Sequence, residues 1–571
     1  MFALLKKMLT WPYWRLALIP SLLFLVSGPA AVKPPGVASL EFRVRLSQQA
    51  ADEIANLGLH VPVDGRLFII VSQDDESEPR EQIDVTGVPF WGKDVFGFSP
   101  KTKWISMNDK DGEIIGYPFA KFSMLPEGDY WVQAFLTVYT KFHRADGFTL
   151  LMHQDAGEGQ WQFESPGNAY SEPILVHLGP KKWGKINLEL TKVIPPIQEL
   201  RPGEVLQQGN PRDTEWVKYV KIKSEVVSAF WGQDMYIGAN ILLPKGYYDN
   251  PDQYYPVIYL QGHFPGAGAP FGFRPGNAFY NFWVSDNAPR FIAVTFRDAN
   301  PYYDTSYSVD SANVGPYGTA ILTELIPYIE TNFRIERQPY ARLLAGGSTG
   351  GWEALAMKVF WPDFFGGTWA WCPDGIDFHY HQLVNVYEDE NAYYRFYDYI
   401  KVERPSSRRA DGNINFTMKQ ENDWERAMGT NDRSGGQWDI WEAVYSPVGP
   451  DGYPAPVWDP VSGAMDHSVA EAWRAYDLNY YMQQNWSALQ PYLDGQLTIT
   501  TGMMDTYFLE EAVYLFEEFV KTANPPADIK FDYGFRKPHC WRGESPTNPG
   551  QQMSYQEFIQ VAWDWYVAHK P

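Results

Sequence analysis

The segment Gly346-Gly347-Ser348-Thr349-Gly350-Gly351 decides the fold of this 571-residue chain. The apolar residues 343–345 precede it and are typical of a buried strand. Apolar residues at helical spacing follow it and stop at Pro362. A Gly-x-Ser-x-Gly motif between a strand and a helix is the context of a nucleophile elbow, a sharp turn that exposes the serine oxygen. We therefore expect Ser348 to be a nucleophile and the N–H of Thr349 to face a developing oxyanion.

Two later predicted strands are each followed by a residue that could assist a nucleophilic serine. Residues 496–502 read as a strand before Asp505, and residues 529–535 read as a strand before His539. Open α/β sheets build their sites at the carboxyl ends of strands. The order serine, acid, histidine is that of the α/β-hydrolases. His569 also follows Asp505, but it ends a predicted terminal helix.

Together these residues predict a catalytic triad. His539 would take the proton of Ser348 and return it to the leaving group, while Asp505 orients the imidazole and stabilises its charged form. Glu510 and Glu511 are alternative acids that lie further into the following helix. Each residue alone could have an ordinary role in a turn, a helix cap or a loop. Their order after three strands is what favours catalysis.

A second backbone donor for the oxyanion is expected in the loop after the predicted strand at residues 256–260. We expect this donor to be the N–H of His263, with that of Phe264 as the alternative. His263 precedes the nucleophile in the chain, so we do not expect its side chain to be the catalytic base.

Residues 315–333 and 346–374 resemble the putative-esterase family of α/β-hydrolases. That family includes esterase D, enterochelin esterase, several feruloyl esterases and the mycobacterial mycolyltransferases. The shared pattern is a helix that ends in an Ile-Pro-Tyr-Ile-Glu type segment, then the elbow, then a helix that ends near residues 361–365. The resemblance covers roughly residues 215–571 apart from a long insertion.

This resemblance implies an α/β fold with a mostly parallel sheet and a serine acyl hydrolase or acyl transferase. The family's triad and oxyanion roles carry over to Ser348, Asp505, His539 and the turn at Gly262-His263. The chain departs from the family at Gly347, in the insertion and in its N-terminal region, and these departures leave the substrate open.

The chain divides into four predicted parts. Residues 1–30 have basic side chains, an apolar run and small residues before Ala30, as in a secretory signal peptide. Residues 37–195 alternate with the period of strands and predict an all-β, sandwich-like domain. Residues 196–214 are the expected linker, and 215–571 the expected catalytic domain. An uncleaved anchor is the alternative for the first part, and we otherwise expect no membrane span in a secreted or periplasmic protein.

Residues 375–495 form an insertion in the catalytic domain that is rich in tyrosine and tryptophan. It joins strands whose ends frame the predicted site, which favours a cap or lid that binds substrate. A structural extension with its own core is the alternative.

The chain has two cysteines, Cys372 and Cys540. Cys372 ends the predicted strand after the nucleophile helix, and Cys540 directly follows His539. Both therefore map to the carboxyl edge of the sheet, and in an oxidising compartment they could form a disulfide. Two separate buried thiols are the alternative.

Composition excludes some partners. The formal net charge of −22 argues against binding nucleic acid or an anionic surface. We expect no metal, because His379 and His381 lack further ligands at motif spacing. Residues 108–113 resemble a calcium loop, but Ala120 stands where the loop needs a glutamate. No cofactor is expected either.

The sequence thus predicts a serine carboxylic-ester hydrolase that forms an acyl-enzyme through Ser348. The expected substrates are small-molecule or carbohydrate-linked esters, such as feruloyl or acetyl groups on polysaccharides, or siderophore esters. A serine peptidase or an acyltransferase with the same triad is the alternative, and a non-catalytic glycan-binding protein is a further one. The acyl group, the alcohol and the oligomeric state are left open.

Overall fold

The computed structural model describes residues 40–153, 161–179, 184–263 and 268–571. The predicted signal peptide and the alternative oxyanion donor Phe264 lie outside these residues. Residues Ser39–Pro571 are one compact unit. The linker at 196–214 therefore stays a prediction.

An eight-stranded sheet carries the site, in the strand order β12-β13-β15-β14-β18-β19-β24-β25. The pairs β12–β13 and β13–β15 are antiparallel, and the other five pairs are parallel. Parallel neighbours bring their carboxyl ends to one edge, where the loops that follow them converge. The strands are β12 (Val217–Ser224), β13 (Met235–Leu242), β14 (Val257–Gln261), β15 (Ile292–Arg297), β18 (Arg342–Gly347), β19 (Thr368–Trp371), β24 (Leu497–Gly502) and β25 (Lys530–Gly534).

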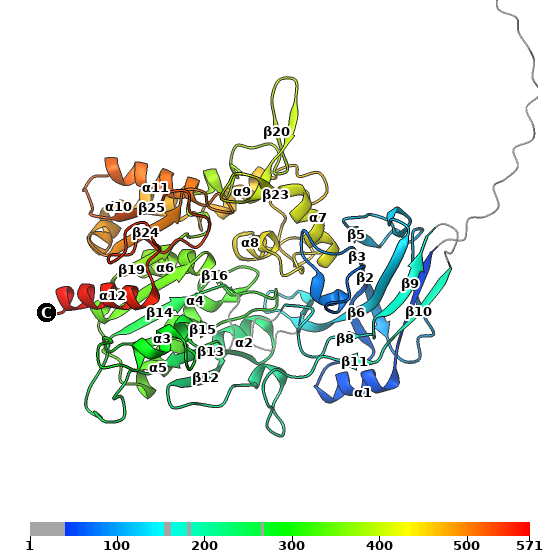
Figure 1. The fold of residues 1–571 in the computed structure, drawn as a ribbon, viewed down its shortest axis with the longest axis horizontal. Coiled ribbons are helices and arrows are strands. Elements are labelled where there is room, and N and C mark those ends of the chain that lie inside the picture. The colour runs from blue at the N-terminus through cyan, green and yellow to red at the C-terminus, as the bar shows by residue number, and fades with distance from the viewer. Residues whose placement is uncertain (1–39, 154–160, 180–183, 264–267) are drawn as a thin grey trace, which may run out of the picture. The chain divides into compact units, whose positions relative to one another are not determined.

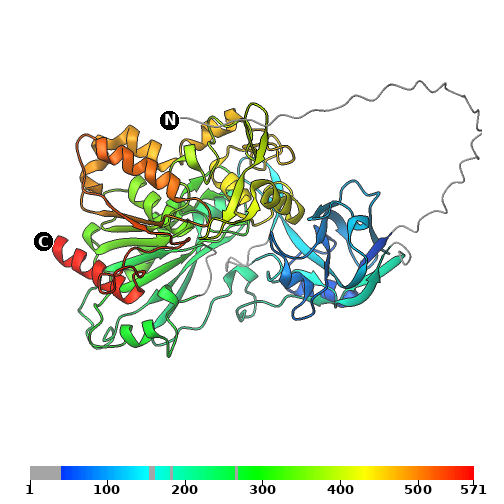
Figure 2. The ribbon, with the colours of Figure 1, turned by 45° about the horizontal axis from the view of Figure 1, so that its top comes forward.

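Helices lie on both sides of this sheet (Figures 1 and 2). Side chains alternate between faces along a strand, so Leu343 joins one apolar cluster and Leu344 joins the other. Residues of α3 and α12 share the cluster of Leu343, and residues of α2, α5, α6, α10 and α11 share that of Leu344. These helices are α2 (Glu225–Trp231), α3 (Ala278–Trp283), α5 (Ile326–Asn332), α6 (Thr349–Phe360), α10 (Leu478–Leu493), α11 (Glu510–Thr522) and α12 (Tyr555–His569).

The N-terminal region contains a three-stranded sheet, β10-β1-β4, and a larger sheet in the order β11-β8-β6-β2-β3-β5, with β7 and β9 also paired to β6. Apolar side chains of both sheets share one core cluster, in which Val44 of β1 and Leu67 of β2 are fully buried. The strands are β1 (Glu41–Leu46), β2 (Val63–Ser72), β3 (Phe90–Phe98), β4 (Ile105–Asn108), β5 (Ile115–Tyr117), β6 (Gly128–His143), β7 (Thr149–His153), β8 (Ala169–Tyr170), β9 (Ile174–Leu178), β10 (Lys185–Leu190) and β11 (Lys192–Val193).

This region is not all-β as predicted, because it also contains helix α1 (Gln48–Asn56). The side chain of Ser47 caps the helix by accepting a hydrogen bond from the N–H of Ala50 at 3.0 Å. Ala51 and Ile54 are buried at helical spacing in the core that the two sheets share. The helix is thus specified by a cap and a short apolar face.

The insertion at residues 375–495 contains two hairpins and four α-helices, one of which is α10. Most of its tryptophans are interior: Trp438 and Trp441 are each only 1% exposed. Its most exposed aromatic residues lie instead on the hairpin β20–β21, which projects in Figure 1, and Tyr399 at its tip is 97% exposed. The elements are β20 (Tyr394–Phe396), β21 (Lys401–Glu403), β22 (Pro405–Arg408), β23 (Ile414–Thr417), α7 (Met418–Met428), α8 (Gln437–Tyr445) and α9 (His467–Trp473).

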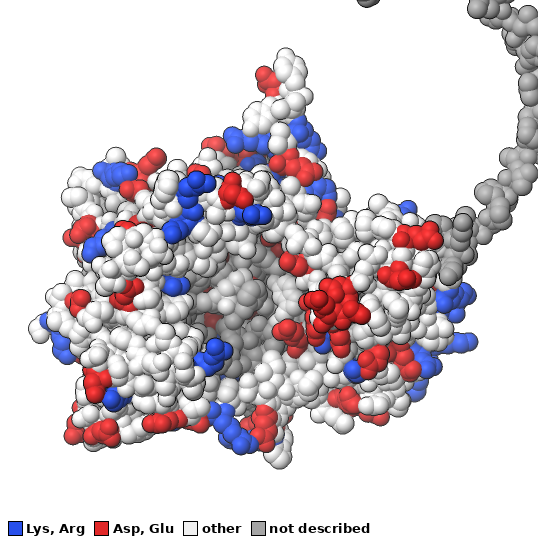
Figure 3. All heavy atoms as spheres, in the orientation of Figure 1, with Lys and Arg blue, Asp and Glu red and all other residues white. Residues whose placement is uncertain are grey.

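On the face that Figure 3 shows, basic side chains are scattered among acidic ones and do not gather into one patch. Within the described ranges, none of the helices has the length and apolar character needed to cross a bilayer.

Candidate active site

Ser348 occupies a sharp turn between β18 and α6. Its backbone has φ 59° and ψ −128°, a conformation that costs a non-glycine residue about 1–3 kcal/mol. The glycines around it permit close packing. A Cβ on Gly346 would lie 2.0 Å from the carbonyl oxygen of Gly350, and one on Gly350 would lie 2.3 Å from that of Gln261. This strained turn has the geometry of a nucleophile elbow.

The structure brings the three predicted triad residues together. The Nε2 of His539 lies 2.8 Å from the Oγ of Ser348, and its Nδ1 lies 2.7 Å from Oδ2 of Asp505. Asp505 follows β24 and is fully buried, while His539 follows β25. Of the alternative acids, Glu510 forms an ion pair with Arg408 of the insertion. The hydrogen-bonded path from serine through imidazole to carboxylate is the arrangement that activates a serine hydroxyl.

Burial alone would disfavour a charged imidazole, but the adjacent Asp505 carboxylate outweighs it and raises the pKa of His539 above the ordinary 6.5. This is the electrostatic role expected of the acid in a triad, because it stabilises the imidazolium that forms during the reaction.

The two cysteines lie beside this histidine as free thiols, with Cys372 buried and Cys540 exposed. Their sulfurs and a ring nitrogen of His539 all lie within 4.8 Å of one another. Hydrogen bonding to Cys372 and to the imidazole lowers the pKa of the Cys540 thiol. The disulfide between them stays a prediction.

The two predicted oxyanion donors come from different parts of the chain. Thr349 is the first residue of α6, so its N–H is among the unpaired donors at a helix N-terminus. His263 lies in the loop after β14, where its Nε2 is 2.7 Å from Oδ2 of Asp304. Burial opposes protonation of His263, but the Asp304 carboxylate raises its pKa above the ordinary value. The role of the His263 N–H stays a prediction.

Three site residues were not predicted from the sequence. Asp374 is buried, and its Oδ1 lies 3.4 Å from the Oγ of Ser348. Its Oδ2 accepts hydrogen bonds from Thr349 Oγ1 at 2.8 Å and from Tyr307 OH at 3.1 Å. Gln437 of the insertion donates to Tyr307 OH at 2.7 Å. A signal for Asp374 was present, since it follows β19 at the same edge of the sheet.

The two histidines considered as metal ligands do not converge. His379 pairs with Asp377 at 2.8 Å. Both ring nitrogens of His381 are buried without a hydrogen-bond partner among aromatic side chains that include Trp441. Desolvation lowers the pKa of His381 to about 3, so its ring is neutral.

Residues 230–397 match the family model described as Putative esterase. Over this segment the chain is similar to the putative-esterase family. The matched range contains Ser348 and Asp374 but ends before Asp505 and His539. The chain is accordingly a serine ester hydrolase, as the sequence resemblance implied.

Three solved structures illustrate what this esterase is similar to. A ferulic acid esterase has 16% identity and a TM-score of 0.36, covering 62% of this chain and 98% of its own. S-formylglutathione hydrolase from Staphylococcus aureus has 12% identity and a TM-score of 0.32, covering 61% and 99%. A ferulic acid esterase from Anaeromyces mucronatus, in complex with ferulic acid, has 15% identity and a TM-score of 0.29, covering 64% and 95%. No curated protein matches the chain.

A cavity of about 400 Å³ adjoins the elbow of the esterase. The carboxyl ends of β14, β18 and β19 and the loop that contains His539 contribute to its wall, through residues such as Gly347 and Cys540. Trp371 and Tyr555 add aromatic surface, and Arg542 adds a positive charge. The cavity is large enough for a small acyl group beside the serine.

Proposed function

We propose that the chain is an exported serine carboxylic-ester hydrolase that acts through Ser348, His539 and Asp505 and an acyl-enzyme. The observation that carries this proposal is the hydrogen-bonded path from Ser348 Oγ to His539 at 2.8 Å and from His539 to Asp505 at 2.7 Å. These residues lie where β18, β24 and β25 end at one edge of the sheet. Ser348 lies within the segment that matches the esterase family, and Asp505 and His539 lie outside it.

The proposed mechanism has two half-reactions. Ser348 attacks the ester carbonyl while His539 takes the hydroxyl proton, and the oxyanion is stabilised by the N–H groups of Thr349 and His263. His539 then gives the proton to the leaving alkoxide, and the alcohol departs. Water, deprotonated by the same imidazole, attacks the acyl-enzyme and releases the acid. Asp505 remains ionised and holds the imidazole in the tautomer that can accept the serine proton.

We propose that the acyl group enters the cavity beside the elbow, and that feruloyl-type or acetyl-type esters on polysaccharides, or siderophore esters, are its substrates. Trp371, Tyr555 and Phe271 line the cavity and could pack against an aromatic acyl group. Arg542 could pair with an acidic substituent. An aromatic acyl group should therefore be favoured over an acetyl group.

The proposed organisation is a secreted or periplasmic protein with a signal peptide at 1–30, a sandwich-like domain at 37–195, a linker at 196–214, and a mostly parallel α/β-hydrolase domain at 215–571 capped by residues 375–495. The basic, apolar and small residues before Ala30 support export. The core that the two N-terminal sheets share supports the sandwich. Intact-mass measurement of protein recovered from the culture medium or periplasm tests the cleavage.

Ser348→Ala tests the activity itself. Turnover of p-nitrophenyl acetate and methyl ferulate should fall by at least about 10⁴-fold, with the melting temperature retained. Ser285→Ala is the matched control, because this serine lies outside the site, where its hydroxyl donates to the carbonyl of Phe282 and accepts from the N–H of Asn287. Equal turnover in Ser348→Ala and wild type would refute the proposal. Cleavage of peptide amides without esters would indicate a peptidase, and acylation of an added sugar in preference to water would indicate an acyltransferase.

A further inference from the structure

The loop at residues 298–308, which follows β15, is buried throughout and runs beside the catalytic serine. Its backbone is strained, since Tyr303, Tyr307 and Ser308 have φ of 65°, 58° and 53°. Bulky side chains rarely adopt positive φ, and such conformations persist only where the surrounding structure imposes them. The contacts around this loop therefore determine its shape.

Two side chains of the loop reach the groups around Ser348. Asp304 binds His263 at 2.7 Å. Tyr307 donates to Asp374 at 3.1 Å, and its hydroxyl lies 3.2 Å from Oγ1 of Thr349. The loop thus contacts both Thr349 and His263. These are the two residues whose N–H groups are expected to bind the oxyanion.

The N-terminal β region holds this loop from outside the catalytic domain. The ring of His153, at the end of β7, packs against the ring of Tyr303 with centroids 3.8 Å apart and the planes tilted by 34°. Asn168 donates to Tyr303 OH at 3.3 Å. His153 is itself immobilised, because it is completely buried and its Nε2 lies 2.5 Å from the carbonyl oxygen of Arg433. Burial holds its pKa well below the ordinary value, so the neutral ring donates through Nε2–H.

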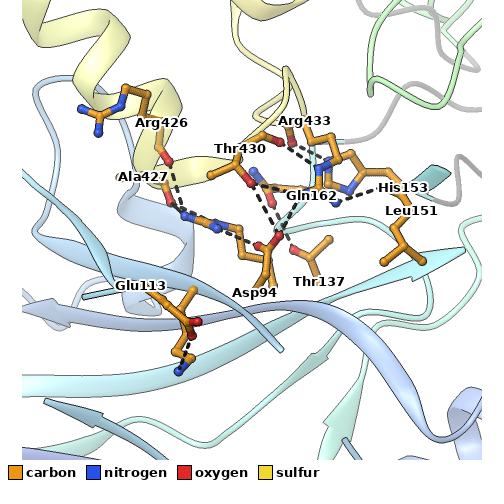
Figure 4. Close-up of polar contacts among 12 residues, drawn as sticks. Asp94, Glu113, Thr137, Leu151, His153, Gln162, Arg426, Ala427, Thr430 and Arg433 are labelled. Atoms are coloured by element: carbon orange, nitrogen blue, oxygen red, sulfur yellow. Dashed lines mark hydrogen bonds and ion pairs between the residues drawn. The ribbon is translucent and has the colours of Figure 1, made fainter. Parts of the chain in front are cut away.

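The insertion contacts both the N-terminal β region and the 298–308 loop. Asp94 of β3 forms an ion pair of 2.7 Å with Arg433 of the insertion (Figure 4). It forms a second ion pair, also of 2.7 Å, with Arg66 of β2. Arg66 also donates to the carbonyl of Ala427 at 3.0 Å, at the end of α7. Gly435 then lies against the loop, where a Cβ would be 3.2 Å from the Cβ of Tyr303.

We propose that the N-terminal β region is a working part of the catalytic unit and not a detachable module. The contact between His153 and Tyr303 holds the 298–308 loop in its strained form, and the loop positions His263 and Thr349 around the nucleophile. His153 and Tyr303 are thus positioning residues, which touch no reacting atom. This inference rests on the proposed esterase function of Ser348.

The experiment uses the full mature chain with Tyr303→Asn. Asparagine tolerates positive φ, so this substitution removes the ring contact without adding backbone strain. We expect kcat for p-nitrophenyl acetate to fall about 10–100-fold with KM changed less than about 3-fold, because misplaced donors weaken the transition state and not substrate binding. The rate of Ser348 labelling by a fluorophosphonate should fall in parallel.

Three further variants keep the test decisive. Tyr303→Phe retains the ring that contacts His153, so its kcat should be much closer to that of wild type than the kcat of Tyr303→Asn is. Tyr130→Asn is the matched control, because Tyr130 is a buried tyrosine of β6 that bonds only the carbonyl of Pro126, and its kcat should stay near that of wild type. If Tyr303→Asn does not fold, His153→Leu can be used in its place. This variant removes the other ring of the contact and should give the same loss of kcat.

Wild-type kcat and labelling rate in folded Tyr303→Asn or His153→Leu would overturn the inference. So would an equal loss of kcat in the control Tyr130→Asn, since the effect would then be general destabilisation. Failure of wild type to react with the fluorophosphonate would instead contradict the proposed function. The two failures are thus distinguishable.

Discussion

The Oγ of Ser348 lies 3.4 Å from a carboxylate oxygen of Asp374, as well as 2.8 Å from the Nε2 of His539. A hydroxyl has one proton to donate, so the two acceptors compete, and the shorter contact favours the imidazole. Burial raises the pKa of Asp374, and its Oδ2 already accepts hydrogen bonds from Thr349 Oγ1 and Tyr307 OH. Asp374 therefore fits a residue that orients Thr349, while Asp505 serves the histidine.

Asp505→Asn should lower kcat about 10⁴-fold, because an amide cannot hold His539 in the tautomer that accepts the serine proton. Steady-state kinetics on p-nitrophenyl acetate would measure this loss. Glu510→Gln is the comparison, since Glu510 pairs with Arg408. A larger loss in Glu510→Gln than in Asp505→Asn would show that the acid has been assigned wrongly.

Asp374→Asn should lower kcat only about 10-fold, because the amide preserves the shape of the carboxylate and the triad stays complete. The hydrogen bond from Thr349 Oγ1 would be kept through the amide oxygen. The same kinetic assay checks this value. If Asp374→Asn were as inactive as Asp505→Asn, Asp374 would have to be counted among the catalytic residues.

Activity should depend on pH through His539. The general base must be neutral, and the Asp505 carboxylate raises the pKa of His539 above 6.5. As pH rises through that pKa, the imidazolium loses its proton and kcat/KM increases, so the midpoint of the acidic limb should lie above pH 6.5. A kcat/KM profile measures it, and Asp505→Asn should move the midpoint to lower pH. A midpoint that stays in place in this variant would contradict the assignment.

Protein recovered from an oxidising compartment should contain a bridge between Cys372 and Cys540, whose sulfurs lie within 4.8 Å of each other. Iodoacetamide applied to the unfolded, unreduced protein should then label neither cysteine, and prior reduction should expose both. Mass spectrometry reads the result. Labelling of both cysteines without reduction would establish two separate thiols.

The juxtaposition of Ser348, His539 and Asp505 could be predicted from the sequence because each residue follows a strand with an apolar pattern. Asp374 follows a strand as well, but no motif spacing distinguishes it from a turn residue. Tyr307 and Gln437 meet across 130 positions of sequence, and such contacts leave no local pattern. The contact between His153 and Tyr303 was inaccessible for the same reason.

Composition was a poor guide to the insertion. Its many tyrosines and tryptophans did not decide between a substrate-binding cap and a structural extension with its own core, and in the structure Trp438 and Trp441 are buried. Aromatic side chains serve both in core packing and in ligand binding, so the number of them in a segment does not show which role they have. Helix α1 was missed because its apolar face has only a few small or branched residues among polar ones.

Intact-mass spectrometry after fluorophosphonate treatment tests the central claim most directly. A fluorophosphonate reacts covalently with an activated serine, so wild type should gain one adduct and folded Ser348→Ala should gain none. An adduct on Ser348→Ala, or no adduct on folded wild type, would contradict the proposal that Ser348 is the activated nucleophile of this esterase.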